Sequence, residues 1–247
     1  MWVWDRPGPA ALVDFAHRQG VGDLFVSTPG ALASSPELRW FRRLRARTAS
    51  AGLRLQALGA EPGWLDEPAA ARAWQRQALG SGLFDGVHLD VEPWLHRRWP
   101  RAAPALLSAW VDLLALLQDD AAVPVEADIP FWLHEHPVGG RPGDEAVMSA
   151  VDAVTVMSYR TTVVGPDSVT GLAAAALATA QRLRRPVRLA VETRRLDDPA
   201  ADKQTFHGAS RRELGRALEQ VTVHLDTHPT YRGVAVHDHR GWVAMAP

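Results

Sequence analysis

The sequence predicts a single (β/α)8 barrel that spans residues 1–247. Short apolar runs recur at intervals of roughly 20 to 40 residues, and amphipathic stretches rich in Ala, Leu and Arg lie between them. This alternation of strand-like and helix-like segments is typical of a parallel sheet. Eight such runs in a chain of this length fit a compact barrel. No Pro-, Gly- or Ser-rich linker divides the chain, so we expect one domain.

The expected strands are short and mostly apolar. In chain order they are Trp2 to Trp4, Asp23 to Ser27, Arg54 to Leu58, Gly86 to Val91, Val125 to Ile129, Ala153 to Met157, Val187 to Val191 and Gly233 to His237.

The expected helices have apolar residues at helical spacing. In chain order they are Ala10 to Gln19, Pro36 to Ala51, Pro68 to Leu79, Ala103 to Gln118, Gly143 to Ala150, Val169 to Leu183 and Arg211 to His228.

The main alternative fold is a doubly wound open sheet. Its nucleotide-binding forms carry G-x-G-x-x-G or a P-loop after an early strand, and neither pattern occurs here. Gly80, Gly82 and Gly86 precede a strand instead of joining a strand to a helix, so they predict a turn and not a phosphate site.

Composition excludes several classes of function. The net charge of -1 argues against nucleic acid or an anionic membrane as the main partner, and the absence of Cys excludes thiolate catalysis and Cys-ligated zinc. The chain starts without a signal-peptide pattern, and no uninterrupted apolar stretch reaches the ~18 residues of a membrane span. We therefore expect a cytoplasmic protein without a bound cofactor or metal.

The fourth predicted strand carries the strongest functional signal. Strand alternation places His88, Asp90 and Glu92 on one face and three apolar residues on the other. If the apolar face packs on helices, the polar face enters the barrel. Carboxylates inside a barrel are costly to desolvate unless they are paired or used, so this face indicates a site.

Other strand ends add polar and aromatic residues to the same predicted edge. Alternation places Tyr159, Glu192, Asp128 and His237 on the inward faces of four later strands. A second set consists of Trp residues at or just beyond strand ends, where aromatic faces can stack on sugar rings. These are Trp4, Trp64, Trp94, Trp132 and Trp242.

Two short motifs resemble the chitinase-like family eighteen glycoside hydrolases. The fourth strand resembles the family's D-G-x-D-x-D-x-E, with His88 in place of the middle Asp. The matching residues are Asp85, Gly86, Asp90 and Glu92. The segment from Met157 to Arg160 resembles M-x-Y-D, with Arg160 in place of the Asp, and Trp242 follows the eighth strand as the family's Trp does.

The resemblance implies substrate-assisted retaining hydrolysis, in which the 2-acetamido group of an N-acetylated sugar attacks the anomeric carbon. It makes Glu92 the general acid, Asp90 the group that orients the acetamide, and Tyr159 a hydrogen-bond donor to the acetamide oxygen. Arg160 and Arg194 either recognise an anionic substrate or lie solvated at the surface. The expected partner is a sugar-containing small molecule or oligosaccharide.

Three alternatives remain open. Glu92 with Glu192 resembles the acid and nucleophile of two-carboxylate retaining glycosidases, and Glu92-Pro93 echoes their N-E-P, although Val91 stands where they have Asn. The segments His237-Asp238-His239 and His134-Glu135-His136 suggest a metal-dependent hydrolase. The third alternative is a chitinase-like barrel that binds sugar without cleaving it. Schiff-base chemistry is disfavoured, because Lys203, the only Lys, lies in a late loop.

Overall fold

The computed structural model describes residues 1–247, apart from the side chains of residues 199 and 200. Its main sheet has eight strands in the order β1-β2-β3-β4-β5-β8-β9-β10, and the strand pairs whose register is resolved are parallel. This is the predicted (β/α)8 barrel fold. The strands are β1 (Trp2–Val3), β2 (Asp23–Ser27), β3 (Arg54–Gly59), β4 (Gly86–Leu89), β5 (Val125–Pro130), β8 (Ala153–Met157), β9 (Val187–Glu192) and β10 (Tyr231–His237).

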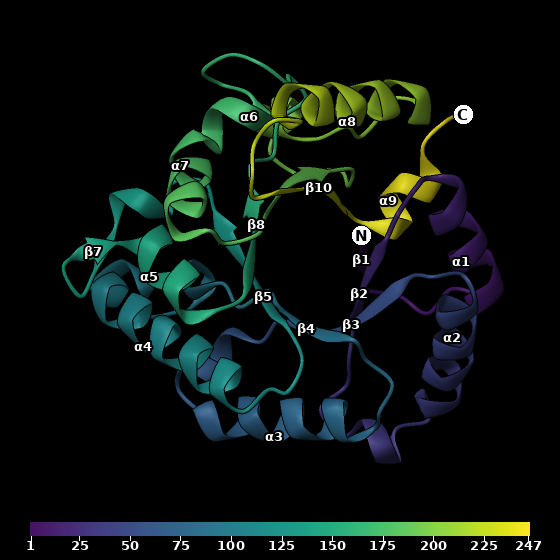
Figure 1. The fold of residues 1–247 in the computed structure, drawn as a ribbon, viewed down its shortest axis with the longest axis horizontal. Helices are drawn as coiled ribbons and strands as arrows, with labels where there is room; N and C mark the ends of the chain where they lie inside the picture. Colours follow the sequence, from purple (N-terminus) through teal and green to yellow (C-terminus); the bar gives the residue numbers. More distant parts are fainter. The chain divides into compact units, whose positions relative to one another are not determined.

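Contacts divide the chain into two compact units, Met1–Glu126 and Ala127–Pro247, and the boundary falls inside β5. In the first unit, the helices lie on the outer side of the strands (Figure 1). They are α1 (Pro9–Arg18), α2 (Leu38–Ser50), α3 (Pro68–Gly80) and α4 (Trp99–Asp119).

Each of these helices has one apolar face. In α2, Phe41, Leu44 and Thr48 are fully buried, whereas the Arg residues of the helix are exposed apart from the half-buried Arg45. Helix α4 is long and apolar enough to pass as a membrane span, with a mean hydropathy of 1.3 over its most apolar window. It nevertheless has a buried face with residues at helical spacing and an exposed Asp112 in its middle, as a helix packed on a sheet has. The buried residues are Leu106, Leu107, Trp110, Leu113, Leu114 and Leu117.

The second unit contains α5 (Gly143–Ala150), α6 (Val169–Leu172), α7 (Ala174–Leu183), α8 (Arg211–Leu225) and α9 (His239–Ala244). Helix α8 begins with a capping box, in which Ser210 and Glu213 each accept a hydrogen bond from the other's backbone N–H. A two-residue hairpin, β6 (Pro137–Val138) with β7 (Arg141–Pro142), precedes α5.

The predicted strands and helices are confirmed, with end shifts of a few residues. Short 3-10 helices lie in several of the predicted loops, and three larger features differ. The helix expected over residues 169–183 is two helices that share Ala173 as a cap. The hairpin and α9 lie outside the predicted elements. Each is too short to show a periodic pattern, and α9 begins at a side-chain cap, since Asp238 accepts a hydrogen bond from the N–H of Gly241.

Candidate functional site

The end of β4 places two carboxylates beyond the strand. The strand itself stops at Leu89, and the backbone N–H of Asp90 still donates to the carbonyl of Gly59 at the end of β3, at 2.8 Å. Glu92 is the N-terminal cap of the 3-10 helix η3 (Pro93–Leu95). Asp90 and Glu92 are partly exposed, whereas Val91 between them is buried. The predicted alternation therefore continues past the strand end.

His88 lies within the strand and is fully buried. Its ring stacks on Phe25 of β2, with a centroid distance of 3.7 Å and an interplanar angle of 14°. The ring of Trp2 lies perpendicular to that of His88, at a centroid distance of 5.4 Å. His88, which the sequence suggested as a substrate contact, is thus part of the packed interior of the first unit.

Asp85 precedes β4 and anchors its start. Its carboxylate accepts hydrogen bonds from the guanidinium of Arg45 on α2 and from the backbone N–H of Leu55 on β3. Burial opposes its ionisation, but these hydrogen bonds outweigh burial and hold the pKa of Asp85 below its ordinary value. The first Asp of the motif therefore ties two strands to a helix.

A pocket of about 740 Å³ lies beyond the ends of β1, β2 and β3. Trp4 and Trp64 both line it, as expected for side chains at strand ends. Trp64 is 7% exposed, because it packs on Trp74 at a centroid distance of 4.9 Å. Trp4 is more exposed and offers the larger accessible aromatic surface of the two.

Three further Trp residues lie at or beyond strand ends, as the sequence predicted. Trp94, in η3, is partly exposed and meets Trp110 edge to face at 5.9 Å. Trp132 is partly exposed and contacts His136, whereas Trp242 on α9 is 3% exposed.

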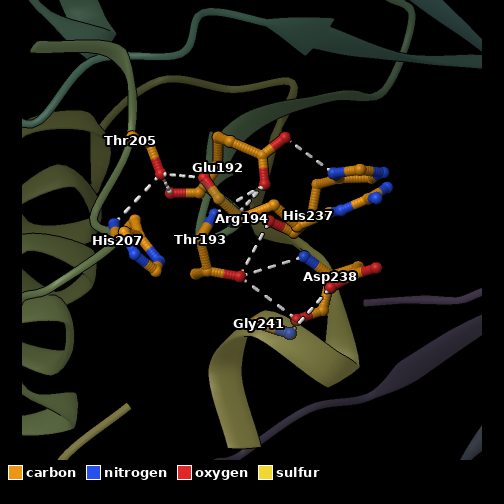
Figure 2. A network of polar contacts seen from close by, with 8 residues as sticks. All are labelled: Glu192, Thr193, Arg194, Thr205, His207, His237, Asp238 and Gly241. Carbon is orange, nitrogen blue, oxygen red and sulfur yellow. Dashed lines mark hydrogen bonds and ion pairs between the residues drawn. The ribbon is translucent and has the colours of Figure 1, made fainter. Parts of the chain in front are cut away.

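In the second unit, Glu192 and His237 form a hydrogen-bonded pair at the ends of β9 and β10 (Figure 2). The register of these strands places the two residues directly opposite each other. His237 Nδ1 lies 2.8 Å from Glu192 Oε2. Glu192 Oε1 accepts hydrogen bonds from the backbone N–H groups of Thr193 at 2.8 Å and Arg194 at 2.7 Å.

Thr193 fixes the backbone around this pair. Its hydroxyl donates to the carbonyl of His237 at 3.0 Å and accepts from the N–H of Asp238, also at 3.0 Å. Thr205 donates to the carbonyl of Arg194 at 2.6 Å (Figure 2). Sequence reasoning missed both Thr residues, since a single Thr beside a strand end carries no pattern of its own.

The remaining expected site residues of this unit differ in exposure. Tyr159 follows β8, and its ring lies 6.4 Å from that of His237. The Arg160 guanidinium donates to Asp167 at 2.6 Å and lies over the ring of Phe131. The Arg194 side chain is exposed, and Asp128 in β5 is 1% exposed.

Asp167 links two long loops of the second unit. It accepts hydrogen bonds from Lys203 and from Arg160, which together hold the pKa of Asp167 below its ordinary value. Lys203 therefore serves as an ion-pair partner at the surface. Among the described residues, no group of three or more His, Asp or Glu side chains is placed to hold a metal ion.

The fold is shared with solved glycoside hydrolases. A chitinase from Chromobacterium violaceum matches 98% of this chain and 96% of its own with a TM-score of 0.61, at 13% identity. A GH113 β-1,4-mannanase matches 98% of this chain and 87% of its own with a TM-score of 0.63, at 11% identity. The spore cortex-lytic enzyme SleL of Bacillus megaterium matches 98% of this chain and 71% of its own with a TM-score of 0.59, at 11% identity.

No protein-family model and no curated protein matches the sequence. At these identities the structural likeness concerns the fold. It confirms the predicted resemblance to chitinase-like barrels at that level, and the roles of individual residues rest on their own geometry.

Proposed function

We propose that the protein is a glycoside hydrolase that acts on an oligosaccharide or another glycosylated small molecule, with Glu92 as its general acid. The observation that carries the proposal is the position of Glu92, a partly exposed carboxyl group just beyond β4, two residues after Asp90. In (β/α)8 barrels, residues at this end of the strands form the catalytic site. The fold neighbours support the same class, since their names describe chitinase, mannanase and cortex-lytic activity.

The chemistry needs a carboxyl group that carries a proton when substrate binds. A negatively charged neighbour favours the protonated form of a carboxyl group, and Asp90 is the carboxylate two residues away on the same side of the chain. Glu92 would protonate the glycosidic oxygen as the bond breaks. If the sugar is N-acetylated, its acetamide supplies the nucleophile, with Asp90 and Tyr159 in the orienting roles that the motif resemblance implies.

The test is hydrolysis of aryl glycosides with and without a 2-acetamido group, together with chitin and mannan oligosaccharides. We expect Glu92→Gln to lower kcat by about 100-fold or more with a similar Tm, because general acid catalysis contributes on that scale. Glu219→Gln, on the exposed face of α8, is the matched control and should keep wild-type activity.

The outcomes separate the alternatives. Hydrolysis limited to 2-acetamido substrates supports substrate assistance, and equal hydrolysis of mannosides supports a nucleophilic carboxylate. Wild-type kcat in Glu92→Gln would show that the acid is another residue. Sugar binding by calorimetry without hydrolysis of any substrate would identify a carbohydrate-binding barrel instead.

A further inference from the structure

The pocket at the ends of β1, β2 and β3 has the size and lining of a sugar site. Its volume of about 740 Å³ lies within the range of about 300 to 1,000 Å³ that is typical of small-molecule sites. Trp4, which lines it, is only partly buried, and an accessible indole face can stack on the C–H face of a sugar ring. Trp64 and Trp74 also line the pocket and pack on each other, so its aromatic wall is preformed.

The pocket adjoins the proposed catalytic carboxylates through the backbone. Gly59, the last residue of β3, lines the pocket, and its carbonyl accepts a hydrogen bond from the N–H of Asp90 at 2.8 Å. The lining residues, Asp90 and Glu92 all belong to the same compact unit. A ligand in the pocket would thus lie beside the strand end that Asp90 follows.

Arg6 is the positively charged residue among those that line the pocket, and the protein itself uses its donors. Its Nε and Nη2 donate to Glu37 Oε2 at 2.9 Å and 2.7 Å. Nη2 also donates to the carbonyl of Ser27, and Nη1 donates to the carbonyl of Asp5. The charge of Arg6 is therefore compensated by Glu37, and its guanidinium is held in place by the protein.

Glu61 gives the pocket a negative charge that no cation compensates. It lines the pocket, is exposed, and has no ion-pair partner within the described part of the chain. Because Arg6 and Glu37 cancel, the lining carries one negative charge in excess. Such a pocket repels uronic acids and phosphorylated sugars and attracts a cation. An ammonium group suits the lining, since it can pair with a carboxylate and lie over an indole face.

We infer that this pocket binds a hexosamine unit whose amine is free, with Trp4 against the sugar ring and Glu61 paired with the ammonium group. Where it concerns hydrolysis, the inference rests on the proposed function. It then names the substrate as an oligosaccharide that combines N-acetylated and de-N-acetylated units. The acetamide of one unit serves the reaction at Glu92, and the free amine of another unit is held in the pocket.

Binding is measured at the pocket itself by ¹H–¹⁵N NMR of the Trp4 indole N–H, with Trp4→Phe used to assign the signal. The probes are the trimers of glucosamine, N-acetylglucosamine and galacturonic acid, at about pH 6, below the pKa of a free amine. We expect the glucosamine trimer to shift the Trp4 signal with a Kd at least about 5-fold below that of the acetylated trimer. The galacturonic acid trimer should not shift it. The signal of Trp110, which is fully buried on α4, should not move with any probe.

Glu61→Gln removes the charge and keeps the size of the side chain. We expect it to raise the Kd of the glucosamine trimer by about 3- to 10-fold, because the ammonium group loses its carboxylate partner. The Kd of the acetylated trimer should change by less than about 2-fold, since that sugar carries no charge. Glu67→Gln is the matched control, because Glu67 is exposed but is not among the residues that line the pocket. It should bind both trimers as the wild type does.

This binding measurement does not depend on activity, so it separates a failure of the inference from a failure of the proposed function. An acetylated or galacturonic acid trimer that binds at Trp4 as tightly as the glucosamine trimer would overturn the inference. An unchanged Kd in Glu61→Gln, or no shift of the Trp4 signal with any trimer, would overturn it as well. The expected binding preference without hydrolysis of any substrate would support the inference and contradict the proposed function.

Kinetics test the part of the inference that concerns hydrolysis. The measured quantity is the ratio of kcat/KM for a partially de-N-acetylated chitin oligosaccharide to kcat/KM for the fully acetylated one of the same length. We expect this ratio to exceed one in the wild type and to fall by about 3- to 10-fold in Glu61→Gln. The same ratio in both proteins would show that Glu61 does not hold the amine during the reaction, and would overturn this part.

Discussion

Different interactions build the carboxyl ends of the first strands and those of β9 and β10. At the end of β3, Gly59 lies against the packed rings of Trp64 and Trp74, beside the pocket that Trp4 also lines. At the end of β9, the carboxylate of Glu192 contacts two backbone N–H groups and an imidazole. One region is organised by aromatic packing and the other by polar contacts.

The two regions also differ in how exposed their candidate carboxylates are. Glu92 stands on a short 3-10 helix beyond its strand and is partly exposed. Glu192 is the last residue of its strand and is buried. Both residues are candidate carboxylates by sequence order, but Glu92 is partly exposed, whereas the carboxylate of Glu192 accepts hydrogen bonds from two backbone N–H groups and is bonded to His237.

The largest expected difference between the regions is in stability. Glu192→Ala removes one partner of a buried hydrogen-bonded pair and should lower the free energy of unfolding by about 3 to 5 kcal/mol. Glu92→Ala should lower it by less than about 1 kcal/mol, because the side chain is partly exposed. Urea unfolding with fitted m-values measures both. Equal losses in the two variants would contradict the comparison.

The sequence predicted the fold well because its strands are either fully buried or alternate, and both patterns depend on local residue type. The eight strands and the parallel arrangement follow from this, as do Asp90 and Glu92 on one side of Val91. The interior position of His88 was predicted too. Its packing on Phe25 was not, because that contact depends on the register of residues far apart in the chain.

The details of the second region were harder to predict for a similar reason. Glu192 and His237 were both candidates, but their pairing depends on the register between β9 and β10. Two of the hydrogen bonds that the Glu192 carboxylate accepts come from backbone N–H groups, which side-chain identity does not reveal. Asp85, which the motif grouped with the acid, proved to bind Arg45 at the opposite end of its strand.

One glycine in each region allows its packing to be tested, because substitution by Ala adds a single methyl group. A Cβ on Gly59 would meet Trp64 at 2.5 Å and Trp74 at 2.8 Å, and a Cβ on Gly241 would meet Thr193 Oγ1 at 2.5 Å. We expect Gly59→Ala and Gly241→Ala each to cost about 1 to 3 kcal/mol in unfolding free energy. Only Gly241→Ala should also shift the ¹⁵N resonances of His237.

The matched controls are glycines with open space around the added methyl group. Gly63→Ala near the pocket should have little effect, and Gly215→Ala on α8 should stabilise the protein by about 0.5 to 1 kcal/mol through its helix propensity. If Gly59→Ala is as well tolerated as Gly63→Ala, the aromatic packing beyond β3 is looser than the structure indicates.

The smallest expected effect concerns Asp85, a polar anchor in the region that is otherwise held by packing. Asp85→Asn keeps an acceptor for the N–H of Leu55 but loses the charge opposite Arg45, so we expect a loss of about 1 to 2 kcal/mol at pH 7. The folded-state pKa of Asp85 is lowered, so its contribution is complete above the unfolded pKa of about 3.9 and is lost as the pH falls through the folded value. The wild type and Asp85→Asn should therefore converge in stability below about pH 4.

Urea unfolding at pH 7, 5, 4 and 3 measures this convergence. If the two proteins differed in unfolding free energy by the same amount at every pH, the effect of the substitution would come from packing and not from charge. The start of β4 would then be held by packing, like the rest of its region.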